Sequence, residues 1–169
     1  VENAAEGEDV RAVIAGLATA AFCAFLALYP ALALGAAQRI APSPFLRLTM
    51  VLPATWTLSE WLRGTLFTGF PWLASGYAHT DGPLAGYAPL LGVYGITLAA
   101  ALFAGALAVL ALPLNERGVR GYVWLTVVAA VTLVGGLVLG EQRWTHPVGA
   151  PIRVKLVQAN LPQDTKFTI

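Results

Sequence analysis

Three long runs without a charged residue constrain this chain more than any other feature of its sequence. They cover residues 12–38, 82–115 and 121–140, which are 27, 34 and 20 residues long. An α-helix rises about 1.5 Å per residue, so about 20 apolar residues cross a hydrocarbon core of roughly 30 Å. Each run is therefore long enough to cross a membrane as a helix.

The composition points to the same class of protein. Hydrophobic residues make up 57% of the chain and charged residues 11%, whereas soluble domains carry about 25% charged residues. This excludes a disordered segment, a coiled coil and a nucleic-acid-binding domain, which need low hydrophobicity, charged flanking positions and a basic face. The single cysteine, Cys23, excludes an internal disulfide framework and a multi-cysteine metal site. We predict an integral membrane protein without a metal or cofactor.

The hydrophobic pattern predicts an all-α bundle of four transmembrane helices. We place these helices at residues 10–37, 45–64, 89–112 and 119–140, after an acidic segment at residues 1–9. The first and third connections are short and contain proline, so both are expected to be tight helical hairpins. The second helix is the least regular, because Glu60 and Arg63 lie in its last turns.

The connection over residues 65–88 differs from the other two. It is long, rich in glycine and aromatic residues, and almost uncharged. A loop in water would be more polar, so we expect this one to lie at the membrane surface or to dip into it, where protein contacts satisfy its backbone. Long loops in compact domains are often functional.

The arginines suggest an orientation. Arg39, Arg47, Arg117 and Arg120 lie on the side of the two short connections, which positive-inside bias places in the cytoplasm. The acidic segment, the 65–88 loop and the carboxyl-terminal residues are then expected on the outer face.

The pattern changes after the last predicted helix. Residues 141–151 form a linker, and residues 152–160 alternate apolar and polar side chains, which predicts a β-strand. A lone strand is not stable. We therefore expect residues 152–169 to begin a soluble domain, and the chain to be part of a longer protein.

Two segments of the chain resemble one known family. Residues 59–96 contain Glu60, Arg63 and the run Gly-Phe-Pro-Trp at 69–72, and residues 154–167 read VKLVQANLPQDTKF. In this order they resemble bacterial apolipoprotein N-acyltransferases, from about Leu46 to the end. The first predicted helix matches only as a hydrophobic span. Phe167 stands where the family commonly has tryptophan.

The resemblance implies an enzyme of the bacterial inner membrane. Such an enzyme moves an acyl chain from a phospholipid to the amino terminus of a diacylglyceryl-cysteine lipoprotein, through a thioester on a cysteine assisted by a glutamate and a lysine. These three residues belong to a periplasmic nitrilase-like domain beyond the end of this chain, so no catalytic residue is assigned here. The resemblance further implies a monomer that does not bind nucleic acid.

The resemblance also implies a set of substrate-contacting residues. They are Phe70, Trp72, Arg63, Glu60, Tyr77, Gln158, Asn160, Lys166 and Phe167. Phe70 and Trp72 would line a cavity that admits lipid, and Arg63 would meet a phospholipid phosphate. The plainer interpretation makes Glu60 and Arg63 an interfacial ion pair and the aromatics an interfacial anchor.

Several other residues have structural interpretations. Asp81 before Gly82 fits ordinary turn chemistry, Cys23 is expected to be a buried, inert thiol, and the small residues of the third helix suit close packing. Two alternatives stay open: a transporter or channel subunit with a re-entrant loop, and a structural membrane module. Sequence beyond Ile169 distinguishes them, because the enzyme requires a nitrilase-like domain and a transporter requires further hydrophobic spans.

Overall fold

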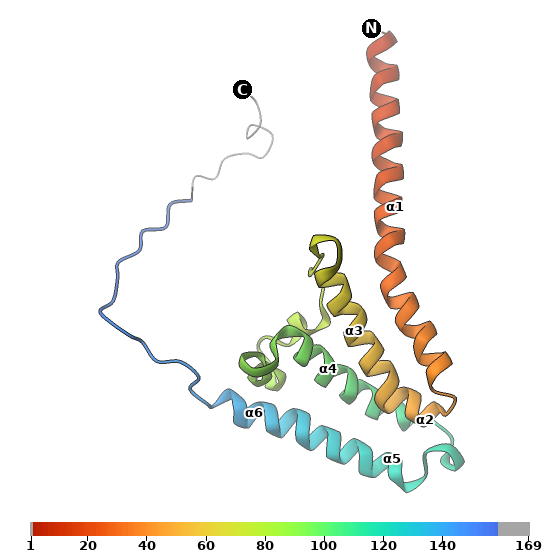
Figure 1. The fold of residues 1–169 in the computed structure, drawn as a ribbon, viewed down its shortest axis with the longest axis vertical. Helices are drawn as coiled ribbons and strands as arrows, with labels where there is room; N and C mark the ends of the chain where they lie inside the picture. The colour runs from red at the N-terminus through yellow and green to blue at the C-terminus, as the bar shows by residue number, and fades with distance from the viewer. Residues whose placement is uncertain (1, 159–169) are drawn as a thin grey trace.

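The computed structural model describes residues 2–158, and the regular elements within this range are all helical (Figure 1). The α-helices are α1 (Glu2–Ile40), α2 (Pro44–Leu46), α3 (Leu52–Thr65), α4 (Ala88–Val109), α5 (Leu114–Ala129) and α6 (Gly135–Gly140). The π-helical turns η1 (Arg47–Val51) and η5 (Ala130–Val134) join α2 to α3 and α5 to α6, and the 3-10 turns η2 (Leu66–Thr68), η3 (Ser75–His79) and η4 (Pro83–Tyr87) lie between α3 and α4. The chain is therefore helical at all four predicted positions.

Three helical stretches of the described chain are long and apolar enough to cross a membrane. They are Asp9–Ile40, Pro83–Val109 and Leu114–Gly140. The remaining predicted span, residues 45–64, is helical through α2, η1 and α3, but α3 has only 14 residues and includes Glu60 and Arg63. The structure thus supports a helical membrane bundle, and the count of four spans stays a prediction.

The helices form two hairpins that meet at one end. α1 turns back into α3, α3 packs against α4, and α4 packs against α5. The α1–α3 and α4–α5 turns lie at the same end of the molecule (Figure 1), where the Arg120 guanidinium lies 4.8 Å from the centre of the Phe45 ring. At the same turn, Arg47 donates hydrogen bonds of 3.0 and 2.9 Å from Nε and Nη2 to the Ala41 carbonyl. The prediction that both short connections share one side is confirmed.

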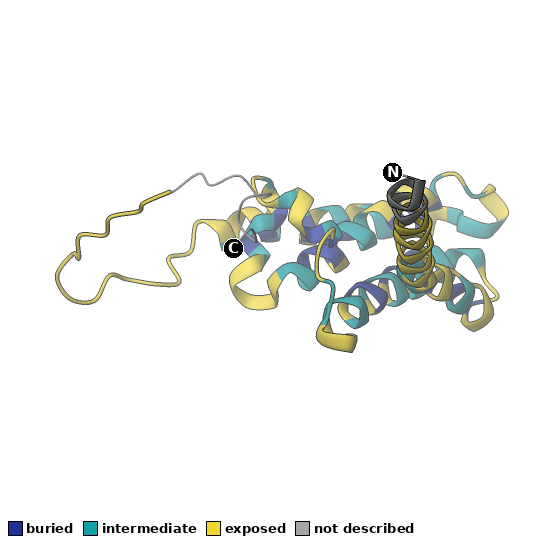
Figure 2. Cartoon of the chain, turned by 90° about the horizontal axis from the view of Figure 1, so that it is seen from above, coloured by how far each residue is buried: buried dark blue, intermediate teal, exposed yellow. Residues whose placement is uncertain are grey.

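The first half of α1 projects beyond the rest of the bundle (Figure 1). Residues 9–25 are exposed throughout, as the yellow colour along this helix shows (Figure 2). Large apolar side chains are among them, and Leu17 is 67% exposed. Hydrocarbon exposed in this way is stable in a bilayer but unfavourable in water. This half of α1 therefore has the surface of a lipid-facing helix.

Glycines allow the helices to approach closely at two contacts. A Cβ at Gly105 of α4 would overlap the carbonyl oxygen of Leu48, and one at Gly136 of α6 would overlap the carbonyl oxygen of Pro83. The interpretation of small residues in the third helix as packing residues is confirmed at Gly105, and Gly136 makes an equally close contact. The second contact brings α6 against η4, so the chain leaves the bundle at the end that holds the α3–α4 loop.

The carboxyl-terminal segment runs away from the helices (Figure 1). Residues 152–158 have no regular structure, and Ile152, Val154 and Leu156 are exposed. Residues 159–169 lie outside the described part of the chain. A strand is stable only beside another strand, and the described residues provide no partner for this one. The strand and the domain that it would begin therefore stay predictions.

Candidate functional site at the α3–α4 loop

The α3–α4 loop, residues 66–87, agrees with the loop predicted over residues 65–88. Phe67, Thr68 and Gly69 all have positive φ, at 51°, 71° and 82°. This region is uncommon for residues other than glycine, and it turns the chain sharply at the end of α3. The Phe70 N–H then donates a 2.7 Å hydrogen bond to the Arg63 carbonyl. The loop therefore folds back over the last turn of α3 and brings the Gly-Phe-Pro-Trp run beside it.

Glu60 is the most highly connected polar residue of the site. Its side chain is 5% exposed and lies between α3, the loop and α4. Ser75 donates to it from its backbone N–H, at 3.1 Å to each carboxylate oxygen, and from its hydroxyl, at 2.6 Å to Oε1. Thr97 Oγ1 of α4 donates to Oε2 at 2.9 Å, and Trp56 Nε1 donates to Oε1 at 3.2 Å. We call Glu60, Ser75, Thr97 and Trp56 the Glu60 latch.

The ion pair between Glu60 and Arg63 does not form in the described structure. The spacing of three residues allows such a pair, but donors from the loop and from α4 already occupy both oxygens of Glu60. The Arg63 side chain is half-buried, and its Nε and Nη2 have no hydrogen-bond partner among the described residues. The spacing along one helix could not reveal partners that lie 15 and 37 residues away.

An aromatic cluster joins the loop to α1. The rings of Phe70 and Phe22 lie 5.3 Å apart in an edge-to-face arrangement, and those of Phe67 and Phe25 lie 6.0 Å apart. Phe25 also meets Tyr29 edge-to-face at 5.6 Å. Edge-to-face pairs of this kind are favourable contacts. They place the Phe70 side chain of the loop against α1, at the point where α1 begins to leave the bundle.

Two further aromatic residues of the loop, Trp72 and Tyr77, are exposed. Trp72 is 70% exposed, its neighbour Leu73 is 84% exposed, and Tyr77 is exposed as well. Side chains of this type at this exposure suit the interface between lipid and water. The structure thus separates Phe70, which packs on α1, from Trp72, which is free to contact lipid.

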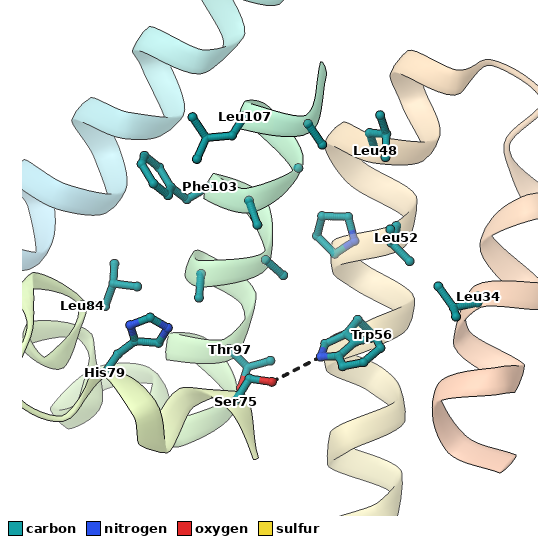
Figure 3. A pocket seen from close by; sticks show the side chains of 16 residues that line it. Leu34, Leu48, Leu52, Trp56, Ser75, His79, Leu84, Thr97, Phe103 and Leu107 are labelled. Atoms are coloured by element: carbon teal, nitrogen blue, oxygen red, sulfur yellow. Dashed lines mark hydrogen bonds between the residues drawn. The ribbon is translucent and has the colours of Figure 1, made fainter. Parts of the chain in front are cut away.

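A pocket of about 600 Å³ opens beneath the loop, between α3 and α4 (Figure 3). Its lining is almost entirely hydrocarbon and includes Leu34 of α1, Leu52 of α3 and Phe103 of α4. The polar lining residues, Trp56, Ser75, His79 and Thr97, gather at the end nearest the loop (Figure 3). Ligand pockets in proteins typically measure about 300–1,000 Å³. The pocket has the size and polarity for a chain of methylene groups with a polar group at one end.

Sequence reasoning did not predict this pocket. Its α4 wall consists largely of small residues: Ala100, Ala101, Ala104, Gly105 and Ala108. Of these, Ala100 and Gly105 had a packing interpretation from the sequence. Small side chains along one helix face permit either close packing or a hollow, and only the position of α3 decides which. Here Gly105 serves both purposes, because it contacts the Leu48 carbonyl and also lines the pocket.

The remaining predicted residues lie elsewhere. Phe70 and Trp72 do not line this pocket. Gln158 is exposed in the irregular segment beyond α6, and Asn160, Lys166 and Phe167 lie outside the described residues. Cys23 is exposed on the projecting half of α1, so the prediction of a thiol buried within the protein is wrong. Phe22 and Phe25 on either side of it contact the loop, whereas the Cys23 side chain lies on a part of the helix surface that the loop does not cover.

The fold and the site define a helical membrane protein with an apolar pocket under a folded loop. Residues 3–106 match the family described as the apolipoprotein N-acyltransferase N-terminal domain. The chain belongs to this family. The match reaches back through α1, so the family likeness begins earlier than the expected start near Leu46.

Individual relatives carry the same family name. The apolipoprotein N-acyltransferase of Ralstonia nicotianae is 51% identical in an alignment of 163 residues that covers 94% of this chain and 30% of the relative. That of Methylococcus capsulatus is 48% identical over 95% of this chain and 31% of the relative. That of Chromobacterium violaceum is 46% identical over 86% of this chain and 28% of the relative. The chain thus spans about three-tenths of the length of these relatives.

Proposed function

We propose that this chain is the membrane part of an enzyme that transfers an acyl chain from a phospholipid to the amino terminus of a diacylglyceryl-cysteine lipoprotein. The names of its relatives support lipoprotein N-acylation in general. The structural observation that carries the proposal is the apolar pocket of about 600 Å³, whose polar residues all lie at the end beneath the loop.

The pocket would hold an acyl chain of the phospholipid donor. Moving a chain from hydrocarbon into water costs about 0.8 kcal/mol per methylene. A pocket inside the membrane bundle avoids this cost, because the chain stays in apolar surroundings while its ester lies at the polar end. The bundle would therefore present the ester at the membrane surface.

The chemistry would take place in the nitrilase-like domain expected to begin at residues 152–169. A cysteine thiolate would attack the ester carbonyl, forming a thioester and releasing the lysophospholipid. The lipoprotein amine would then attack the thioester, forming the amide and returning the thiol, with a glutamate taking up and giving back the proton and a lysine assisting. Splitting the transfer in this way replaces one difficult step by two easier ones.

The predicted contact residues have distinct proposed roles. Trp72 and Tyr77 would contact the donor lipid from the loop. Phe70 would form the part of a lipid-entry cavity that lies beside α1. Arg63 would bind the lipid phosphate through its guanidinium, whose Nε and Nη2 have no hydrogen-bond partner in the described structure. Gln158, Asn160, Lys166 and Phe167 would lie at the mouth of the catalytic domain.

An acyl-transfer assay tests the proposed function. The full-length protein, reconstituted with a phospholipid and a diacylglyceryl-cysteine lipopeptide, should add one acyl chain to the peptide amine, which mass spectrometry detects. Before the lipopeptide is added, the protein should gain the mass of one acyl chain through a thioester that hydroxylamine releases. A protein that binds phospholipid but never gains this mass would contradict the proposal.

We expect the α3–α4 loop and the α4–α5 turn on opposite sides of the inner membrane, with the loop in the periplasm. Thr80 and Asn115 are exposed at these two positions. In whole cells, and with the protein's other cysteines replaced by serine, a membrane-impermeant maleimide should label a Thr80→Cys variant and should label an Asn115→Cys variant only after the cells are lysed. Equal labelling of both variants in intact cells would rule out this topology.

Cys23 is expected to have no part in the transfer, because it lies on the projecting half of α1, far along the helix from the pocket residue Leu34. The Cys23→Ser variant of the full-length protein should therefore form the thioester at a rate within about twofold of the wild type, as expected for a surface substitution. Loss of the thioester in this variant would show that the thiol is required.

A further inference from the structure

We infer that Glu60 is a positioning residue: through the Glu60 latch it holds the middle of the α3–α4 loop on the bundle and so sets the position of Phe70 and Trp72. The latch itself is a structural inference. Its consequence for acyl transfer rests on the proposed function.

The geometry of the latch identifies Glu60 as its centre. Four groups point hydrogen-bond donors at one carboxylate: the backbone N–H and hydroxyl of Ser75, the hydroxyl of Thr97 and the indole N–H of Trp56. The two hydroxyls are already acceptors, since Ser75 Oγ lies 3.4 Å from Trp56 Nε1 (Figure 3) and Thr97 Oγ1 accepts from the Gly76 N–H at 2.9 Å. Each hydroxyl therefore has its proton directed at Glu60.

The latch connects the loop to two helices at once. Glu60 and Trp56 belong to α3, Ser75 begins η3 in the loop, and Thr97 belongs to α4. Removing the carboxylate leaves several donors in a buried site without an acceptor, and such unpaired groups are strongly unfavourable. The loop would then separate from α3 and α4 at Ser75. This point lies five residues after Phe70 and three residues after Trp72.

The latch also forms the polar end of the pocket. Trp56, Ser75 and Thr97 line the pocket and bind Glu60. A loosened loop would therefore shift both the aromatic residues above the pocket and the pocket's own polar end. Small displacements of this kind reduce reaction rates strongly, because the reacting groups must be closely aligned.

Hydrogen–deuterium exchange of the full-length protein tests the latch without any assay of activity. Glu60→Gln keeps the size of the side chain but replaces one acceptor oxygen with an N–H₂ donor, which would face the existing donors. We expect amide exchange at residues 75–77 to become about tenfold faster, with exchange in α5 unchanged. Unchanged exchange at residues 75–77 would overturn the inference.

Thr97 provides a second variant with a matched control. Thr97→Val should accelerate the same amides, and Thr97→Ser, which restores the hydroxyl, should return them to the wild-type rate. Thr132 is similarly buried, but its hydroxyl donates within its own helical run, to the Val128 carbonyl at 2.7 Å. Thr132→Val should therefore leave residues 75–77 unchanged. If Thr132→Val accelerated these amides as much as Thr97→Val, the latch would not be their cause.

The two half-reactions distinguish positioning from a general loss of structure. With Glu60→Gln, thioester formation from phospholipid should slow about tenfold, whereas transfer from the preformed thioester to the lipopeptide should keep its rate. Equal slowing of both steps, with a lowered unfolding temperature, would show a purely structural role and overturn the inference. A wild-type protein that forms no thioester would instead refute the proposed function. The hydrogen–deuterium exchange at residues 75–77 would then be the test of the Glu60 latch.

Discussion

A phenylalanine at position 101 should slow thioester formation by about a hundredfold. Ala101 lies on α4 in the wall of the pocket of about 600 Å³, and it is half-buried there. A benzyl group at this position would occupy space intended for the acyl chain. The acyl chain would bind in a displaced position, and its ester would no longer align with the thiol of the catalytic cysteine. The rate of mass gain by the full-length protein, with excess phospholipid, measures the effect.

The matched control is Ala129→Phe. Ala129 has the same intermediate exposure, but it lies on α5 and does not line the pocket. It should form the thioester at nearly the wild-type rate. The Ala101→Phe variant should also retain more activity with donors that carry short acyl chains, because these need less of the pocket. Equal losses with short and long chains would argue that the pocket does not hold the donor.

Trp72→Ala should slow thioester formation by about tenfold. The Trp72 side chain is 70% exposed, so its removal should change the free energy of unfolding by less than about 0.5 kcal/mol. At the upper end of its usual range an aromatic contact contributes about 1.4 kcal/mol, which corresponds to roughly a tenfold change in rate. The measurement is again the rate of acyl-enzyme formation, with thermal unfolding followed in parallel.

Trp144 provides the control for this substitution. It is also partly exposed, at 43%, but it lies beyond α6 in the linker. Trp144→Ala should reduce the rate much less than Trp72→Ala. If both variants lost the same activity, the effect would reflect general membrane anchoring by tryptophan, and the proposed role of Trp72 in contacting the donor would be wrong.

Local features of the sequence predicted much of the fold. The charge-free runs located the apolar helices, because exclusion of charge from hydrocarbon acts on each residue separately. The loop boundaries at Thr65 and Ala88 followed from glycine, proline and aromatic residues that interrupt the helical pattern. The shared side of the two hairpin turns followed from the alternating directions of four successive helices.

The site depended on contacts that no local pattern specifies. Glu60 binds Thr97, which lies 37 residues further along the chain, whereas the sequence suggested the neighbouring Arg63. The pocket arises where the alanine face of α4 meets α3, and its volume depends on how the helices are spaced. Cys23 was expected to be buried because its neighbours are apolar, but an apolar residue in a membrane helix can equally face lipid.

Photo-crosslinking tests most directly the claim that the bundle holds the acyl donor in the pocket. The full-length protein would be incubated with a phospholipid that carries a diazirine near the end of one acyl chain, then irradiated, digested and analysed by mass spectrometry. We predict adducts on pocket residues such as Leu52, Ala104 and Leu107, and their loss in the Ala101→Phe variant. Adducts confined to residues 9–25 of α1, with the pocket residues unmodified, would contradict the account.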